Sequence, residues 1–195
     1  HMPPRQGGPE AAYAAAAEKL KQWQDAGVVR QDPQASIYVY EQSYPWAGRT
    51  HRRKAMVAGV RATPLGEDVI PHEHTFAGPK ADRLMLTRHT GMQLSPIFGF
   101  YEDPSGRVES LVLRTTREEP EAHATLGEVE EKLWVLDDPA AMAEVGKLLK
   151  DTKVFIADGH HRYTTALDYR DAIAAEGGIE PDHPAVLRRF VLLIT

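Results

Sequence analysis

The chain has 195 residues, of which 42% are hydrophobic and 26% charged, as in ordinary globular proteins with one sizeable core. A net charge of -5 argues against a protein built to coat nucleic acid or an anionic membrane, and no apolar run approaches the roughly 20 residues of a membrane span. The absence of cysteine excludes disulfides, thiolate metal sites and cysteine nucleophiles, and it fits a cytoplasmic protein.

The two ends of the sequence bear on its extent. His1-Met2 is typical of a cloning scar, which leaves residues 3–195 as a single predicted domain. The last residues, "RRFVLLIT", predict a core strand that no turn or cap follows. We therefore expect the chain to be a fragment of a longer protein.

The first predicted elements are a helix and a hairpin. Glu10 to Ala26 carries apolar residues at helical spacing and is followed by Gly27, which favours a helix that stops there. The aromatic and β-branched residues of Ser36 to Gln42 predict a strand, and Lys54 to Thr63 is its expected partner. Between them, "RTHRRK" predicts a solvated hairpin tip; it lacks the interleaved aromatics of a nucleic-acid site.

The middle of the chain predicts a loop, a helix and a second hairpin. The loop contains "PHEHT", and the helix runs from Lys80 to Thr90 with Gly91 as its stop. "SPIFGFYED" predicts a strand, and "VESLVLRTT" predicts its partner after a turn at "DPSG".

The last third alternates strands and helices. "EKLWVLD" predicts a strand, and Asp138 with Pro139 predicts the start of a helix that runs to about Lys150. Residues 153–157 predict a buried strand, followed by a helix that ends at Gly177-Gly178 and by a strand over Phe190 to Thr195. The fold class is therefore α+β or α/β, with a mixed β-sheet flanked by helices.

The least ordinary stretch is "ADGHHRYTTAL", where the strand at 153–157 passes into a helix. Free amides at a helix N-terminus bind anions, and Gly159 allows backbone to approach a ligand. Arg162 offers a planar fork for phosphate, while His160, His161 and Thr164 add donors. Asp158 would repel phosphate, which favours a role as magnesium ligand, as base or as a brace for Arg162.

Two further interpretations of these residues remain open. The Asp158-Gly159 pair fits a plain turn with surface histidines, and His72 and His74 around Glu73 fit a zinc site, although no HExxH spacing occurs. Glu73 is a candidate base for a substrate hydroxyl, or one exposed acid among 28. Arg83 is a candidate phosphate ligand or a surface ion-pair partner.

The motif "ADGHHRYTTAL" resembles the loop–helix signature of the ParB/sulfiredoxin-like superfamily, in which such a turn holds nucleotide phosphates. Among enzymes it is similar to the ADP-dependent free-serine kinase. The whole chain resembles domain-of-unknown-function family 1015 through landmarks in order, namely "IYVYEQ", "IPHEHTF", "KADRLML", "LSPIFGFYED", "KLWVLDD" and "FIADGHHRYTTALDYR". Members of that family are about twice as long. Without cysteine, sulfiredoxin chemistry is impossible here, and no helix-turn-helix follows the motif to support DNA binding.

The resemblance implies a ParB/sulfiredoxin-like core and a nucleotide-dependent phosphotransferase, a kinase acting on a small hydroxyl-bearing metabolite such as serine. The implied cofactors are Mg²⁺ and ATP or ADP, with CTP as a further candidate. The catalytic candidates are Glu73 and Asp158, and Asp158 is the metal ligand. The phosphate-binding candidates are Gly159, His160, His161, Arg162, Thr164 and Arg83.

Three other functions compete with the kinase: a nucleotide hydrolase, a non-catalytic nucleotide-sensing module, and a metal-dependent hydrolase. The expected partners are a nucleotide and a small-molecule substrate, with no membrane and no nucleic acid, and the oligomeric state stays open.

Overall fold

The computed structural model describes residues 8–178 and 191–194. Its helices are α1 (Gly8–Asp25), α2 (Ala77–Thr90), α3 (Arg107–Leu113), α4 (Pro139–Leu148) and α5 (His160–Gly177), with a short 3₁₀ helix, η1 (Thr115–Arg117). Its strands are β1 (Ile37–Trp46), β2 (Arg49–Gly59), β3 (Val69–Ile70), β4 (Ile97–Tyr101), β5 (Ala122–Leu126), β6 (Val129–Leu136), β7 (Val154–Asp158) and β8 (Val191–Ile194). The chain therefore has the predicted mixed α/β content.

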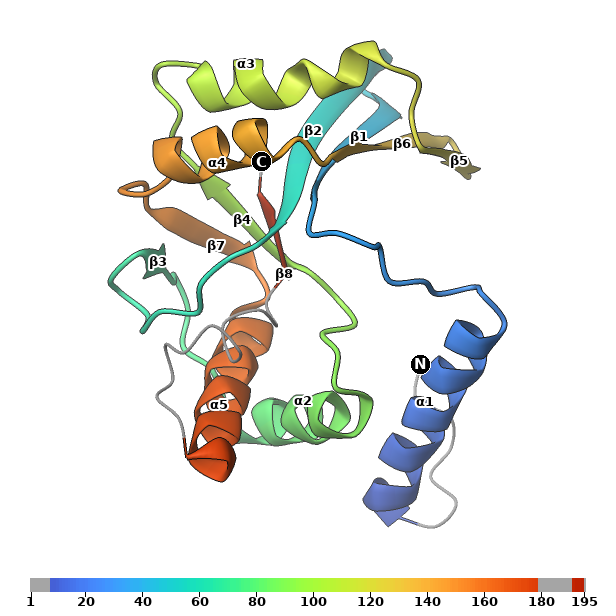
Figure 1. Cartoon of the computed structure of the whole chain (residues 1–195), viewed down its shortest axis with the longest axis vertical. Helices are drawn as coiled ribbons and strands as arrows, with labels where there is room; N and C mark the ends of the chain where they lie inside the picture. Colours follow the sequence, from blue (N-terminus) through green and yellow to red (C-terminus); the bar gives the residue numbers. More distant parts are fainter. Residues whose placement is uncertain (1–7, 179–190, 195) are drawn as a thin grey trace.

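The described strands form one eight-stranded mixed sheet in the order β3-β7-β4-β8-β2-β1-β6-β5. The β3–β7 and β4–β8 pairs are parallel, and the other neighbours are antiparallel. Helices α3 and α4 lie together at one end of the molecule, and α2 and α5 at the other, with α1 beside α2 (Figure 1). Strand β7 leads directly into α5, so the β7–α5 junction lies between the sheet and the helices α2 and α5 (Figure 1).

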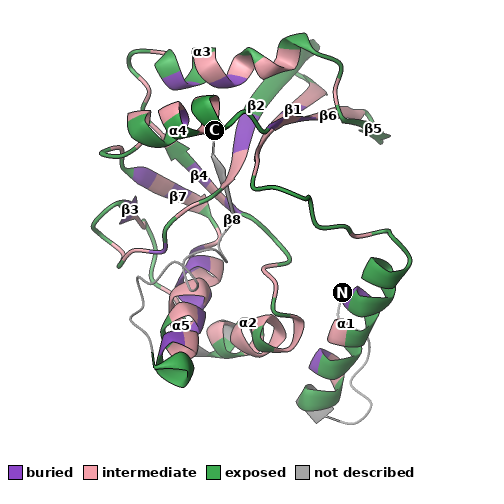
Figure 2. Ribbon diagram, viewed as in Figure 1, coloured by how far each residue is buried: buried purple, intermediate pink, exposed green. Residues whose placement is uncertain are grey.

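The core lies between the sheet and its helices. Buried side chains of β1, β2 and β6 pack with Val108 and Val112 of α3 and with Val145 of α4. Tyr163 of α5 belongs to the same cluster, and buried residues recur along that helix (purple in Figure 2). Burial of these apolar surfaces, worth roughly 25 cal/mol per Å², fixes which helix faces meet the sheet.

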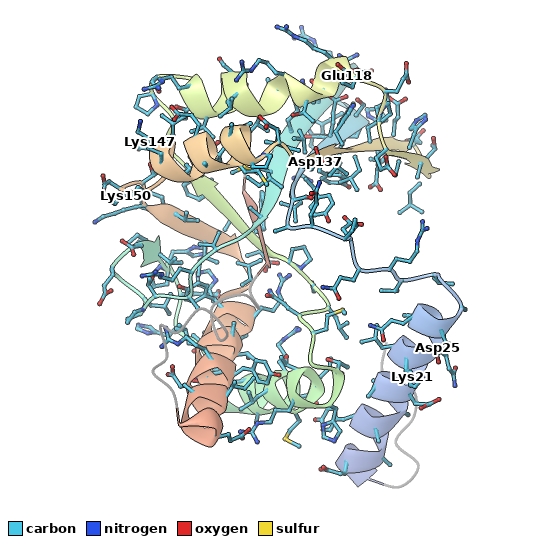
Figure 3. All side chains as sticks on the ribbon, viewed as in Figure 1. Lys21, Asp25, Glu118, Asp137, Lys147 and Lys150 are labelled. Carbon is cyan, nitrogen blue, oxygen red and sulfur yellow. The ribbon has the colours of Figure 1, made fainter. Side chains whose placement is uncertain are left out.

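The outer surface of the described residues carries several local ion pairs. Lys21 lies 2.6 Å from Asp25 at the C-terminal end of α1, and both side chains project into solvent (Figure 3). Such exposed pairs contribute little to stability. No helix in the described ranges has the length and apolar character needed to cross a membrane.

The first hairpin forms as predicted, but its second strand begins earlier than Lys54. Ala47 and Gly48 make the turn, both with positive φ, and "RTHRRK" belongs to β2, where all six residues are exposed. The prediction of a hairpin tip at this run was wrong. A charge run indicates solvent exposure, and an exposed strand end satisfies that pattern as well as a loop does.

The predicted strand "VESLVLRTT" is instead α3 followed by η1. Val108 and Val112 are four residues apart and share the buried face of the helix. The Asp103 carboxylate accepts a hydrogen bond from the Glu109 amide at 3.0 Å, which helps to begin the helix. In so short a segment, β-branched residues satisfied the strand pattern while the i, i+4 spacing was the stronger signal.

The other predicted elements occur close to their expected bounds. Asp138 caps α4 by accepting hydrogen bonds from the amides of Ala140 and Ala141, as expected. Gly91 and Gly178 end α2 and α5 in the left-handed conformation. The described part of the predicted last strand is β8, and Phe190 and Thr195 lie outside the described residues. Strands β3 and β5 were not predicted; β5 is an edge strand with all residues exposed.

Candidate functional site: a polar cleft at the start of α5

A cleft of about 500 Å³ opens where β7 passes into α5. This volume falls within the range of small-molecule sites. Most of the residues that line it are charged or polar: Glu73, Arg83, Ser95, Asp158, Gly159, His160, His161 and Arg162. The cleft thus brings together three segments far apart in the sequence, and it contains every predicted site residue except Thr164.

Gly159 makes the sharp passage from β7 into α5. Its φ of 101° is accessible to glycine but strained for other residues. No side chain caps the helix, and the first intrahelical bond runs from the Tyr163 amide to the Gly159 carbonyl at 2.9 Å. The amides of His160, His161 and Arg162 are consequently donors that the helix itself does not use.

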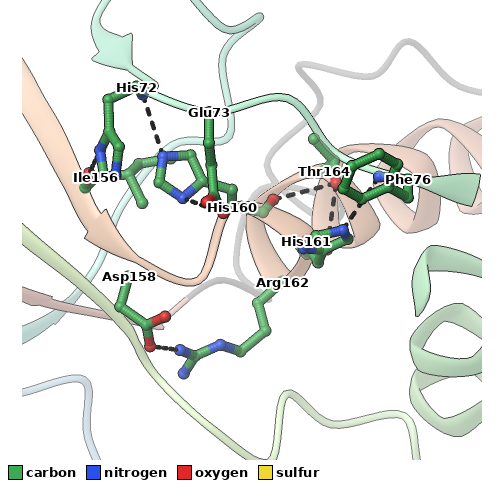
Figure 4. Close-up of polar contacts among 9 residues, drawn as sticks. All are labelled: His72, Glu73, Phe76, Ile156, Asp158, His160, His161, Arg162 and Thr164. Atoms are coloured by element: carbon green, nitrogen blue, oxygen red, sulfur yellow. Dashed lines mark hydrogen bonds and ion pairs between the residues drawn. The ribbon is translucent and has the colours of Figure 1, made fainter.

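Arg162 is held as a brace between β7 and the loop before β4. Its guanidinium donates hydrogen bonds to Asp158, to the Ser95 hydroxyl at 2.8 Å and to the Pro96 carbonyl. It also lies directly over Gly159, where a Cβ atom would come within 2.9 Å of Nε. Of the roles considered for Asp158, the brace is the one that its contacts display (Figure 4).

The loop that carries Glu73 is attached to α5 by two histidine rings. The amide of His72 donates to Nε2 of His160 at 3.2 Å, and the amide of Phe76 donates to Nε2 of His161 at 3.1 Å (Figure 4). A ring nitrogen that accepts a hydrogen bond carries no proton, so each neutral ring bears its proton on Nδ1. His161 can then present its Nδ1–H to the cleft, where the described structure gives that atom no partner.

The Glu73 carboxylate lies at the cleft beside the ring of His160. Oε1 of Glu73 is 3.0 Å from Nδ1 of His160, a distance suited to an ion pair, although the angle leaves Nδ1 without a hydrogen bond. The His160 side chain is 1% exposed, whereas that of Glu73 is 52% exposed. Burial lowers the pKa of His160, outweighing the opposite effect of Glu73. The ring is therefore neutral at pH 7.

Arg83 supplies a cation to the cleft without an internal partner. It is exposed on α2, and no hydrogen bond or ion pair of its guanidinium occurs among the described residues. Its neighbours on the same helix are already paired, Lys80 with Asp168 at 3.0 Å and Arg88 with Glu176 at 3.2 Å. Arg83 is thus available to an anionic ligand, while the Arg162 guanidinium is largely occupied.

Two residues differ from the remaining expectations. Thr164 is buried and does not line the cleft; its hydroxyl donates to the carbonyls of His160 and His161 within α5. Ser95 does line the cleft and was not among the predicted site residues. A serine before a proline at a strand start gave no chemical signal, because the contact with Arg162 spans 67 positions.

Three of the described side chains could in principle hold a metal: His72, Glu73 and His160 offer ligand atoms within 4.8 Å of one another. His72 suits this role, because its Nδ1 donates to the Ile156 carbonyl at 2.9 Å and leaves Nε2 with a free lone pair. His160 does not: a metal on Nδ1 would require a proton on Nε2, which faces the His72 amide. Asp158, the predicted metal ligand, is not in this cluster.

No curated protein and no solved structure matches this chain. A family model described as "Protein of unknown function (DUF1015)" matches residues 2–194, which span every landmark quoted above. The chain therefore belongs to the DUF1015 family.

Proposed function

We propose that this protein is a nucleotide-dependent phosphotransferase that acts on a small hydroxyl-bearing metabolite, with L-serine as the first acceptor to test. One observation carries the proposal: a single cleft joins the uncapped N-terminus of α5, the unpaired cation of Arg83 and the carboxylate of Glu73. Phosphoryl transfer needs chiefly positioning and charge neutralisation, and these groups supply both. The ParB/sulfiredoxin-like resemblance of the turn supports the same function.

The phosphates would be held by donors from both sides of the cleft. The amides of His160, His161 and Arg162 come from the start of α5, and the Nδ1–H of His161 adds a neutral donor. Arg83 approaches from α2. Arg162 acts by keeping Gly159 and the Ser95 loop in place, because its own donors already serve protein acceptors.

Glu73 is the proposed base for the acceptor hydroxyl, because its exposed carboxylate faces the cleft and the one ring that lies against it in the described structure, His160, is neutral. Asp158 is the proposed Mg²⁺ ligand: one oxygen contacts Arg162, the other has no partner among the described residues, and the side chain is 74% exposed. When bound, Mg²⁺ would neutralise phosphate charge. ATP, ADP and CTP are the candidate nucleotides.

Nucleotide binding is tested first by calorimetry with ATP, ADP, CTP and GTP in the presence of magnesium. Arg83→Ala should weaken binding by about 10-fold to 150-fold, the loss expected for one charged hydrogen-bonding contact, without changing stability. The control is Arg88→Ala, on the same helix but paired with Glu176; it should bind like the parent. If the parent binds none of these nucleotides, or if Arg83→Ala binds as tightly as the parent, the proposal fails.

Catalysis is tested by single-turnover assays with serine and other small alcohols. Glu73→Gln should lower the rate by about 10²- to 10⁴-fold and leave nucleotide affinity unchanged, since a general base acts in the chemical step. Nucleotide binding without transfer to any acceptor would instead identify the sensing module. A stoichiometric transition metal in the purified protein would instead favour the metal-dependent hydrolase, for which His72 and Glu73 offer ligand atoms.

A further inference from the structure

The ring of His160 is the most deeply buried polar side chain at the cleft, at 1% exposure. Its Nε2 accepts the His72 amide, so the ring's one proton resides on Nδ1. The rings of His72 and His160 meet edge to face, with centroids 4.4 Å apart, which further fixes the orientation of His160. The structure thus presents a buried N–H donor in one defined direction.

That donor has no hydrogen-bond acceptor in the described structure, and a buried N–H without an acceptor destabilises the fold. The nearest carboxylate oxygen is Oε1 of Glu73, 3.0 Å away. Because the Glu73 side chain is half exposed, its carboxylate can rotate into line with Nδ1–H without repacking the core. The other Glu73 oxygen then remains available to the cleft.

We propose that His160 is a positioning residue, which holds the Glu73 carboxylate by its Nδ1–H in the orientation needed to accept a proton from an acceptor hydroxyl. This role rests on the proposed function of Glu73. It differs from the phosphate-binding role that the sequence suggests for the His160 ring, since the ring is enclosed and only the backbone of that residue can reach an anion. The geometry is that of an imidazole between a backbone donor and a carboxylate.

The charged and titratable groups around the ring come from three segments. Glu73 and His72 lie on the loop before α2, Asp158 ends β7, and His161 follows on α5. The neutral form required for this role is the form in which Nε2 accepts the His72 amide, and burial lowers the pKa of His160 in the same sense, against the opposing effects of Glu73 and Asp158. Two other roles for His160 would give different experimental results. In one, the ring only accepts the hydrogen bond from the His72 amide; in the other, it coordinates a metal through Nδ1.

A matched pair of substitutions distinguishes a His160 ring that positions the Glu73 carboxylate from one that only holds the His72 amide. His160→Asn places an amide N–H near the position of Nδ1 but removes the acceptor for the His72 amide. His160→Gln places a carbonyl near the position of Nε2 but removes the donor to Glu73. In the full chain, the kcat of His160→Asn should stay within about tenfold of the parent's kcat. The kcat of His160→Gln should be about tenfold lower again, and KM for the nucleotide should stay constant in both variants. The reverse order of kcat would overturn the proposal.

Nitrogen-15 NMR of the histidine rings gives a readout that does not depend on turnover. The parent should show His160 as the neutral Nδ1–H tautomer, and Glu73→Gln should move the Nδ1 proton resonance upfield as its carboxylate partner is lost. Three results would overturn the positioning role: an Nε2–H tautomer, an Nδ1 proton resonance that is the same in Glu73→Gln as in the parent, or a change in the His160 ring resonances on titration with Zn²⁺. If the parent shows no phosphotransfer while the spectra agree, the proposed reaction fails and the Glu73–His160 contact stands.

Discussion

Gly159 has a backbone conformation that no other residue type adopts comfortably, and its hydrogen atoms face a guanidinium. Gly159→Ala should lower the free energy of unfolding by about 2–4 kcal/mol, because positive φ is strained and the new methyl group would meet Arg162 at 2.9–3.0 Å. Gly178→Ala is the matched control. It has φ of 60° with open space around the added Cβ, so it should cost only about 1–2 kcal/mol.

Urea unfolding of the two alanine variants measures this difference. The loss at Gly159 should also be accompanied by weaker anion binding, since a displaced Arg162 releases the Ser95 loop. Equal losses at the two glycines would mean that Arg162 moves away without cost and does not brace the turn.

The stability of the fold should depend on pH through His160. Its folded-state pKa lies below the ordinary value of 6.5, chiefly because of burial, so the unfolded chain binds the proton more readily. This contribution to stability is complete above about pH 7.5 and is lost as pH falls through 6.5 towards the folded-state pKa. Urea titrations from about pH 5 to 8 should show it, and the slope attributable to this residue should vanish in His160→Asn. An unchanged slope would assign the effect to other groups.

At the scale of elements, α4 shows how local chemistry alone can begin a helix. The Asp138 carboxylate accepts hydrogen bonds from the amides of Ala141 at 3.0 Å and Ala140 at 3.4 Å, and Pro139 occupies the first helical position. Asp138→Ala should therefore cost about 0.5–2 kcal/mol in thermal or chemical unfolding. Asp151→Ala, an exposed acid just beyond the helix, should change stability by less than about 0.5 kcal/mol. Equal effects would show that the cap is unimportant.

Elements with such signals were predicted, and elements without them were not. Helices α2 and α5 end at glycines in the left-handed conformation, a requirement visible in the sequence. Strand β3 has only two residues, too few for any periodicity, and in the seven-residue α3 the β-branched residues obscured the i, i+4 spacing of Val108 and Val112. Their conformations follow from Asp103 and from pairing with β7, contacts that a local pattern does not contain.

At the scale of the whole molecule, Tyr163 connects α5 to the segment that follows β2. Its hydroxyl donates to the Thr63 carbonyl at 2.7 Å and accepts from the Thr63 amide at 3.1 Å, and the side chain is fully buried. Tyr163→Phe should destabilise the fold by about 1–3 kcal/mol, because both backbone groups of Thr63 would lose this partner.

Tyr44→Phe provides the comparison, since Tyr44 lies partly exposed on the first hairpin and should change stability by less than about 0.5 kcal/mol. Chemical denaturation of both variants measures the difference between their free energies of unfolding. Similar stabilities would indicate that the loop after β2 is not held to α5 through this hydroxyl.

The sequence by itself determined the mixed α/β class, the positions of most helices and strands, the family, and the turn at Asp158–Arg162. These depend on signals within a few residues: periodicity, caps, glycines and a contiguous motif. Only the tertiary structure decided which contacts each site residue makes and which of them face the cleft. It placed Arg162 against Asp158 and Ser95, left Arg83 without a partner among the described residues, and enclosed the His160 ring beside Glu73. The physical reason is that hydrogen bonding and burial across 67 to 88 positions arise only when the sheet brings those segments together.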